Sequence, residues 1–172
     1  VRALSPDIVI EVLTPDFNDR DESIDAVLRA RPHIFNHNLE TVRRLTPSVR
    51  HRATYDRSLR VLGKVKARGG ANVYTKSGLM LGLGETEEEL LKGLEDLRQV
   101  GCDLLTLGQY LQPTQRHARV EEFVTPKAFA AYAAIARAKG FLLVAASPLT
   151  RSSYHAGDDF AQMKAARALR QA

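Results

Sequence analysis

A repeated alternation of apolar runs with amphipathic segments is the feature of this sequence that most constrains its fold. Each apolar run has the length of a buried strand, and each is followed by a segment with apolar residues at helical spacing. Strands that alternate with helices in this way predict βα units and a parallel sheet covered by helices. The predicted strands are residues 7–13, 33–41, 77–84, 102–111 and 141–147. The predicted helices are residues 21–31, 55–70, a segment that begins after Thr86, residues 125–140 and a C-terminal helix at about residues 158–171.

Capping signals mark several of these helix ends. Thr86 is followed three residues later by Glu89, which is the spacing of a capping box. Thr125 precedes Pro126, and proline is favoured at the first helical position. Gly69 is the predicted stop of the helix at residues 55–70, because glycine readily ends a helix.

Length and charge limit the class of protein. A chain of 172 residues, 44% of them hydrophobic, can bury one sizeable core, so we expect residues 1–172 to form a single domain. We interpret the formal net charge of +5 as an excess spread along the sequence, which argues weakly for an anionic partner and against nucleic acid. No run approaches the roughly 18 apolar residues of a membrane span, and no signal peptide opens the chain. We therefore expect no membrane association and a cytoplasmic protein, mitochondrial if its source is eukaryotic.

Polar or glycine-rich stretches follow the predicted strands, and ligands of parallel α/β proteins bind at the carboxyl ends of strands. "NHNLET" (36–41) could hydrogen-bond ribose hydroxyls or an amino acid head group, or it could merely cap a helix. "GLMLGLGE" (78–85) could let the flat face of a ligand lie on the backbone, although glycine-rich strand exits are common. "RSSYH" (151–155) is the stretch that structural roles explain least.

Histidine and cysteine give weaker signals. His33 and His37 could share one face of a strand, but no third ligand is evident nearby, so a zinc site is disfavoured. Cys102 is the only cysteine and is most simply a small core residue rather than a nucleophile.

Taken together and in order, the longer motifs resemble lipoyl synthase, a family of radical S-adenosylmethionine (SAM) enzymes. The motifs are "FNHNLETV", "YDRSLRVL", "TKSGLMLGLGET", "LTLGQYLQPT" and "SPLTRSSYHA", and the resemblance extends from about residue 8 to about residue 160. It implies an α/β fold, a parallel (β/α) partial barrel of the radical SAM type that is TIM-barrel-like and truncated at the N-terminus.

The resemblance also implies an activity. SAM and two 4Fe-4S clusters would lie at the carboxyl ends of the strands, and one cluster would cleave SAM to a deoxyadenosyl radical. That radical would take hydrogen from carbons 6 and 8 of a protein-bound octanoyl group, and the auxiliary cluster would donate two sulfur atoms. The implied partners are octanoylated lipoyl carrier domains, such as the glycine cleavage H protein and 2-oxoacid dehydrogenase E2, and an electron donor such as ferredoxin or flavodoxin.

Site residues follow by matching the family's motifs. Ser153 would bind the auxiliary cluster, an unusual role because cysteine thiolates normally hold such clusters. Arg151 would position the cluster loop or the substrate. The residues expected to contact SAM are Asn36, Asn38, Glu40, Thr41, Lys76, Ser77, Gly78, Gly82 and Glu85.

The sequence departs from the family in its cysteines. The family has two cysteine triads, one spaced C-x-x-x-C-x-x-C, and this chain has neither. Because it also begins at Val1 and enters a predicted strand almost at once, we expect an N-terminal part to be missing and a sheet edge to be open. The chain alone is therefore expected to be inactive.

Two other functions remain open from the sequence. The chain could be a non-catalytic remnant that binds lipoyl carrier domains or SAM. It could also be a phosphate-binding barrel enzyme, which would suit the glycines at the strand ends but would leave "RSSYH" unexplained.

Overall fold

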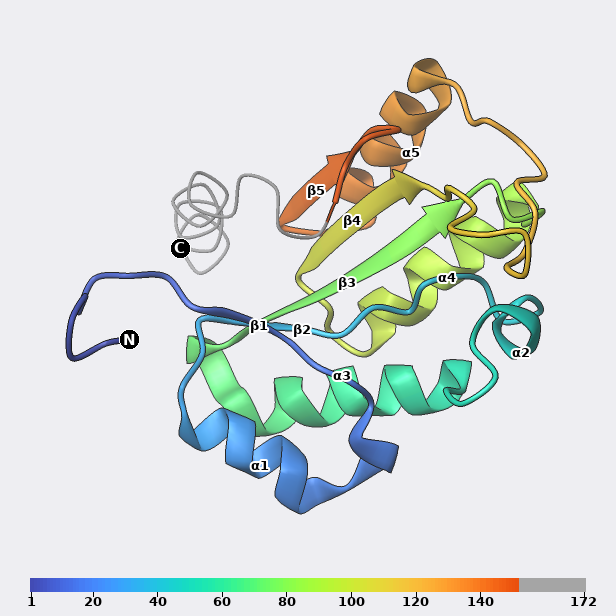
Figure 1. The fold of residues 1–172 in the computed structure, drawn as a ribbon. Coiled ribbons are helices and arrows are strands. Elements are labelled where there is room, and N and C mark those ends of the chain that lie inside the picture. The colour runs from blue at the N-terminus through green and yellow to red at the C-terminus, as the bar shows by residue number, and fades with distance from the viewer. Residues whose placement is uncertain (152–172) are drawn as a thin grey trace.

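The computed structural model describes residues 1–151 and contains one five-stranded sheet (Figure 1). All neighbouring strands are parallel, and the order in the sheet is the order along the chain, β1-β2-β3-β4-β5. Sequential parallel strands joined by helices are the arrangement of part of a (β/α) barrel, as the sequence predicts. The strands are β1 (Glu11–Leu13), β2 (Ile34–Asn36), β3 (Tyr74–Leu81), β4 (Leu104–Gln109) and β5 (Leu143–Ala146).

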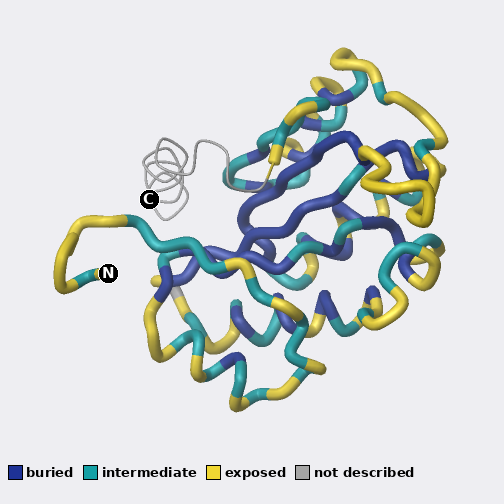
Figure 2. The backbone as a smooth tube through the Cα atoms, viewed as in Figure 1, coloured by how far each residue is buried: buried dark blue, intermediate teal, exposed yellow. Residues whose placement is uncertain are grey.

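Helices cover one face of this sheet, and the strands form the buried centre of the molecule (Figures 1 and 2). The largest apolar cluster joins side chains of α3, α4 and α5 to β3, β4 and β5. A second cluster packs Ile24 and Phe35 against Val61 and Val65. The helices are α1 (Asp21–Arg29), α2 (Thr46–Val49), α3 (Tyr55–Gly69), α4 (Glu87–Gln99) and α5 (Pro126–Ala138), with short 3-10 helices η1 (Phe17–Asp19) and η2 (Gly70–Asn72).

The predicted capping residues are confirmed. The Thr86 hydroxyl accepts from Glu89 N, and the Glu89 carboxylate accepts from Thr86 N, so a complete capping box opens α4. Pro126 is the first residue of α5, after Thr125, whose hydroxyl accepts a backbone N–H. The helix α3 ends at Gly69.

Element boundaries differ from the sequence prediction mainly at the strands. The strands β1 and β2 have three residues each, far fewer than predicted. Pairing of β1 begins only at Glu11, whereas β2 ends early, at Asn36. In contrast, β3 begins at Tyr74, three residues before the predicted start. The short helix α2 was not predicted. The predicted C-terminal helix at about residues 158–171 lies outside the described residues.

No helix within residues 1–151 is long and apolar enough to cross a membrane.

Candidate functional site

A cavity of about 220 Å³ lies at the carboxyl end of β3 and β4. Its walls come from these two strands, from the segment that follows β2 and from the segment that follows β5. The lining residues are Asn38, Glu40, Gly78, Leu79, Met80, Thr106, Gly108, Gln109, Leu111, Thr150 and Arg151.

The register of β3 and β4 explains which side chains face this cavity. Gly78 pairs with Thr106, and Met80 pairs with Gly108. Because successive side chains of a strand point to opposite faces, these four residues share one face of the sheet. Leu79 packs among the helices on the other face and reaches the cavity only through its backbone side.

Two glycines keep the floor of the cavity free of side chains. A Cβ atom on Gly78 would lie 3.0 Å from Asn38 Oδ1, and one on Gly108 would lie 2.6 Å from the carbonyl oxygen of Thr150. Asn38 and the backbone of Thr150 thus pack closely on these two glycines, and a larger residue at either position would displace them.

Backbone hydrogen bonds bring Asn38 and Glu40 to the cavity after β2 has ended. Glu40 N donates to Gly78 O (2.9 Å) and Met80 N donates to Glu40 O (2.8 Å), so Glu40 continues the parallel pairing with β3. Glu40 adopts a φ of 68°, in the left-handed region that side chains other than glycine seldom occupy. Such a conformation persists where the surroundings hold it and is common at binding sites.

Glu40 carries the most perturbed carboxyl group at this cavity. Burial raises its pKa above the ordinary value, while a hydrogen bond with the Asn38 side chain and the positive charge of Arg50 lower the pKa in part. A carboxylate in this state gains from a ligand that offers hydroxyl or ammonium donors, because such a ligand compensates the lost hydration.

Three buried oxygen atoms near this edge have no hydrogen-bond partner. They are Asn36 Oδ1, Asn38 Oδ1 and Thr41 Oγ1. Buried polar atoms are nearly always paired, so three orphans within six residues indicate that water or a ligand completes the site. All three belong to the "NHNLET" stretch. Their presence favours a binding role for that stretch over simple helix capping.

A buried ion pair lies next to the cavity, toward the amino end of β3. Asn36 and Lys76 are register partners on β2 and β3, and Lys76 Nζ lies 3.0 Å from Glu11 Oε2. Asn36 Nδ2 donates to the other carboxylate oxygen of Glu11 at 2.8 Å. Lys76 therefore neighbours the cavity but does not line it.

Six of the nine predicted cofactor contacts do not line the cavity: Asn36, Thr41, Lys76, Ser77, Gly82 and Glu85. Ser77 faces the helices, where its hydroxyl accepts from Leu39 N. The carboxylate of Glu85 accepts the backbone N–H groups of Gly82 (2.7 Å) and Leu83 (2.9 Å) and so shapes its own loop. Thr41 is buried beside the site without lining the cavity. Their cofactor roles stay predictions.

The backbone of Gly82 meets protein rather than open space. Gly82 has a φ of 93°, and a Cβ atom there would lie 2.2 Å from Glu122 O and 2.4 Å from Gln109 Nε2. Glycine is required at this position because the segment before α5 packs directly on it.

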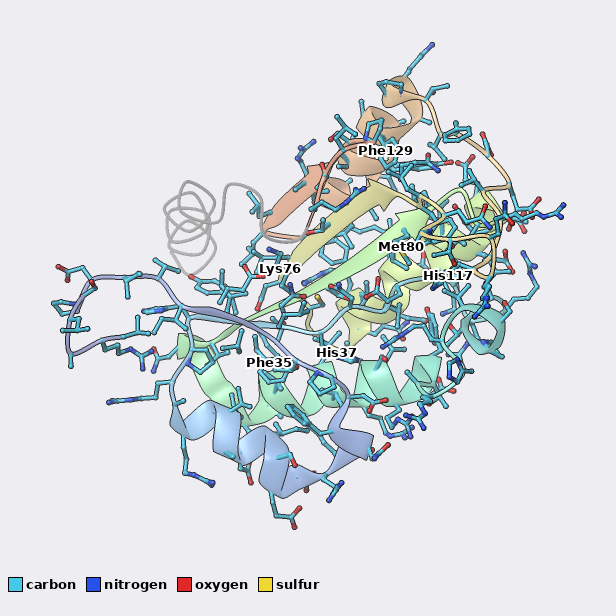
Figure 3. The ribbon with its side chains drawn as sticks, viewed as in Figure 1. Phe35, His37, Lys76, Met80, His117 and Phe129 are labelled. Atoms are coloured by element: carbon cyan, nitrogen blue, oxygen red, sulfur yellow. The ribbon has the colours of Figure 1, made fainter. Side chains whose placement is uncertain are left out.

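The histidines considered as metal ligands have other partners. His37 Nδ1 lies 2.9 Å from Thr14 O and its Nε2 lies 2.9 Å from Ser58 Oγ, so Nδ1 donates and Nε2 accepts. Burial lowers the pKa of His37, which keeps the ring neutral. His33 Nδ1 accepts from Ile10 N. Figure 3 shows His37 beside Phe35 on the helix side of the sheet, away from Met80.

Arg151 lines the cavity, and its role in positioning a loop or substrate stays a prediction. Its Nη1 donates to Thr150 O at 2.8 Å. Ser153, the predicted cluster ligand, lies outside the described residues.

Sequence reasoning missed several lining residues within strands. Thr106, Gly108 and Met80 were treated as parts of apolar strands, although each faces the cavity. Counting by twos from Gly78 along β3, and from its register partner along β4, would have found them.

The family of this chain follows from its sequence. A family model described as the radical SAM superfamily matches residues 1–97, more than half of the chain, and the chain belongs to that superfamily. Members of this superfamily use SAM and a 4Fe-4S cluster.

Among solved structures, the chain is similar to TsrM, a radical SAM methyltransferase from Kitasatospora setae solved with cobalamin and a [4Fe-4S] cluster bound. The TM-score is 0.48 and the sequence identity is 17%. The similarity covers 62% of this chain and 22% of that one.

The cavity fits part of SAM. The Glu40 carboxyl and the orphan Asn38 Oδ1 are acceptors suited to ribose hydroxyls or to the ammonium group. Gly78 and Gly108 add no side chain to the wall of the cavity, and Asn38 and Thr150 pack on them. These residues would therefore hold the cofactor.

The same residues do not fit a 4Fe-4S cluster. Cys102, the only cysteine, is fully buried just before β4, at the opposite end of the strand from the cavity. Burial raises the pKa of its thiol to about 12, so a thiolate is not available there. Residues 1–151 contain no group of three histidine, cysteine or acidic side chains placed to bind a metal. The thiolates for a cluster are not in this chain.

Proposed function

We propose that this chain is the carboxyl-terminal part of a lipoyl synthase, the enzyme that inserts sulfur at carbons 6 and 8 of a protein-bound octanoyl group. In this role it holds SAM and the acyl chain, and other residues supply the cluster thiolates. Support comes from the superfamily match and from the five motifs that occur in the family's order.

The observation that carries the proposal is the meeting of four motifs at one cavity. One of them is "LTLGQYLQPT", which contributes Thr106 and Gly108. Asn38 and Glu40 come from "NHNLET", Gly78 from "TKSGLMLGLGET", and Arg151 from "SPLTRSSYHA". These motifs lie up to about a hundred residues apart in the sequence. Their convergence supports a shared ligand rather than four separate structural roles.

Each residue has a role that follows from its chemistry. Glu40 and Asn38 accept hydrogen bonds from the cofactor, and Gly78 lets the cofactor approach the backbone of β3. Arg151, at the rim of the cavity, orients the loop or the substrate. Bound SAM, cleaved by an electron from a reduced cluster, would supply a radical that removes hydrogen from an unactivated alkyl carbon.

The partners follow from the reaction. The octanoyl group reaches the site on a lipoyl carrier domain, such as the H protein or an E2 domain. Electrons come from a small donor such as ferredoxin or flavodoxin. Ser153 is proposed as the ligand of the auxiliary cluster by its match to the family motif.

Cofactor binding is tested with the full chain and S-adenosylhomocysteine in a titration calorimeter. We expect binding, and we expect Glu40→Gln to weaken it about tenfold or more, because a hydrogen bond to a charged group is lost. Glu22→Gln, at an exposed position on α1, is the matched control and should bind like the wild type. No binding, or equal binding by the Glu40 variant, would contradict the proposal.

Sulfur insertion is tested with the complete coding region that contains this chain, produced with iron and sulfide. We expect it to convert an octanoyl-lysine peptide to lipoyl-lysine, as read by mass spectrometry, when SAM and a reductant are present. Cleavage of SAM without sulfur insertion would indicate another radical SAM activity. If the coding region supplies no cluster thiolates, binding of SAM or of the carrier without turnover is the function that remains.

A further inference from the structure

The positive charge of this chain is concentrated in one short stretch, residues 43–60, which we call the basic segment. Six of the 25 basic residues and one of the 20 acidic residues lie there, which leaves 19 of each in the rest of the chain. The interpretation of the charge as spread along the sequence was therefore wrong. The whole net charge of +5 comes from this segment.

In the fold, the basic segment contains α2 and the first turns of α3. Figure 1 shows α2 at the same end of the sheet as the carboxyl ends of β3 and β4. Charges gathered at this end lie near the cavity rather than near the amino ends of the strands. A partner drawn to them arrives beside the site.

Part of this charge is neutralised within the molecule. Arg57 pairs with Asp16 at 2.6 Å, and both side chains are largely buried. Arg44 pairs with Glu89 at 2.7 Å. These arginines stabilise the fold and offer little to a partner.

Arg43 pairs with Asp56 at 2.7 Å and Arg60 pairs with Asp19 at 2.8 Å. Of the six arginines, only Arg50 and Arg52 have no ion pair with a carboxylate within residues 1–151. Arg52 is exposed, and its side chain makes no hydrogen bond or ion pair within residues 1–151. Arg50 is half-buried and donates only to Leu39 O and Ser58 Oγ, both at 3.2 Å.

Arg50 and His51 line a pocket of about 340 Å³ in front of the first turn of α3, together with Arg43 and Asp56, which pair with each other at 2.7 Å. Arg52 follows His51 in the sequence. The N-terminus of a 15-residue helix adds a positive potential at that point.

Arg50 also connects this pocket to the cofactor cavity. It holds the carbonyl of Leu39, which lies between the two cavity residues Asn38 and Glu40. A carboxylate bound in the pocket would thus lie next to the cavity. A protein that inserts a modified lysine into the cavity would place the surface around that lysine against this pocket.

We propose that the basic segment, through Arg50 and Arg52, docks an acidic surface of the protein that carries the acyl-lysine. The inference rests on the proposed function for the identity of that protein. A compact acidic protein surface fits better than a nucleic acid, because carboxylates lie among the arginines: Asp56 lines the same pocket as Arg50, and Glu88 lines a second pocket with Arg43 and Arg44. An extended phosphate backbone would meet these carboxylates, whereas a few acidic side chains need only the pocket.

The test uses the full chain and three peptides in a titration calorimeter. One carries octanoyl-lysine between aspartate and glutamate residues, the second has the same acidic sequence with unmodified lysine, and the third carries octanoyl-lysine between serine and glutamine residues. At about 50 mM salt we expect the acidic octanoyl peptide to bind about tenfold tighter than the neutral octanoyl peptide. We expect about 300 mM salt to remove this difference in affinity.

Charge-reversal variants locate the surface. Arg52→Glu should weaken binding of the acidic peptides about five- to tenfold, and Arg50→Gln should act in the same direction. Arg29→Glu on α1 is the matched control, because Arg29 is also exposed without a partner in residues 1–151, and it should have little effect. Equal weakening by Arg29→Glu, or no preference for acidic peptides, would overturn the proposal.

The outcomes distinguish docking from the proposed function. If the unmodified acidic peptide binds through Arg52 but the octanoyl group does not increase affinity, the docking surface is supported and the acyl substrate is contradicted. If the acidic and the neutral octanoyl peptides bind with equal affinity, the docking surface is contradicted and the acyl substrate is supported. Tighter binding of a short DNA duplex than of any peptide, lost in Arg52→Glu, would also overturn the acidic protein as the partner.

Discussion

Lys76 Nζ lies 3.0 Å from Glu11 Oε2, so an ion pair joins β3 to the edge strand β1 beneath the cavity. Only 7% of the Lys76 side chain and 17% of the Glu11 side chain are exposed. Asn36, on the strand between them, donates to the second Glu11 oxygen. The Glu11 carboxylate thus connects β1, β2 and β3 directly below the cavity.

Removing this carboxylate should destabilise the fold. Glu11→Ala leaves the buried Lys76 ammonium without the partner seen here, and breaking a buried pair from one side costs about 3–5 kcal/mol. The measurement is urea unfolding followed by circular dichroism. Glu22→Ala, at an exposed position, should change the unfolding free energy by less than about 0.5 kcal/mol. A cost below about 1 kcal/mol for Glu11→Ala would contradict the buried pair.

Local signals in the sequence were sufficient for the longer helices of residues 1–151, although not for the four-residue α2. The capping box of Thr86 and Glu89 and the proline at Pro126 act within one turn, so no distant residue is needed to read them. The strands were harder, because a strand ends where its neighbour stops pairing. The ladders of β2 with β1 and with β3 both end at Asn36, although the segment after it returns to β3 at Glu40.

In the candidate site too, some residues could be predicted from local sequence and others only from the tertiary structure. Asn38 and Glu40 could be predicted, because polar residues directly after a strand reach the ligand edge. Gly82 and Glu85 belong to a familiar-looking glycine motif, yet the structure uses them to pack a loop, since the partner Glu122 comes from forty residues away. Thr106 could not be predicted without the register of β4 on β3.

Replacing Gly82 should be costly. In Gly82→Ala the new Cβ would lie 2.2 Å from Glu122 O at a φ of 93°, so backbone must move. We expect a loss of about 2 kcal/mol or more in unfolding free energy from strain and displaced packing.

Gly63→Ala is the control for that experiment. Gly63 lies within α3, and its new Cβ would find only ordinary contacts at 3.6 Å with Val100. Alanine there should stabilise the helix by about 0.5–1 kcal/mol. If both alanine variants have the same stability, the close approach at Gly82 is wrong.

Glu89 makes stability depend on acid pH. Its carboxylate accepts two bonds from Arg44 and one from Thr86 N, which lower the pKa from the ordinary 4.5 to about 2. Because the folded pKa is below the unfolded value, this contribution is present above about pH 4.5 and disappears as the pH falls toward 2. Glu89→Gln should therefore be less stable than the wild type at pH 7 and equal to it near pH 2. If urea unfolding gives the same difference in unfolding free energy between the two proteins from pH 7 to pH 2, the Glu89 carboxylate is not the source of the pH dependence.

Arg50 should control the acid limit of cofactor binding. Burial raises the pKa of Glu40, and the positive charge of Arg50 opposes that rise. Removing the charge in Arg50→Met should raise the Glu40 pKa further, so the carboxylate becomes protonated at a higher pH. A protonated Glu40 is a poorer acceptor for the cofactor. The acid limb of S-adenosylhomocysteine binding, measured by calorimetry at several pH values, should therefore move to higher pH.

Two further variants separate this electrostatic effect from a purely structural one. Arg50→Lys keeps the charge but cannot reproduce both hydrogen bonds to Leu39 O and Ser58 Oγ with the same geometry. It should retain the wild-type acid limb even if binding is weaker overall. Arg52→Met removes an exposed charge that makes no contact with Leu39 and should leave the limb unchanged. If Arg50→Met and Arg50→Lys weaken binding equally at every pH, Arg50 acts only by holding the Leu39 carbonyl, because a change in shape alone does not shift a titration.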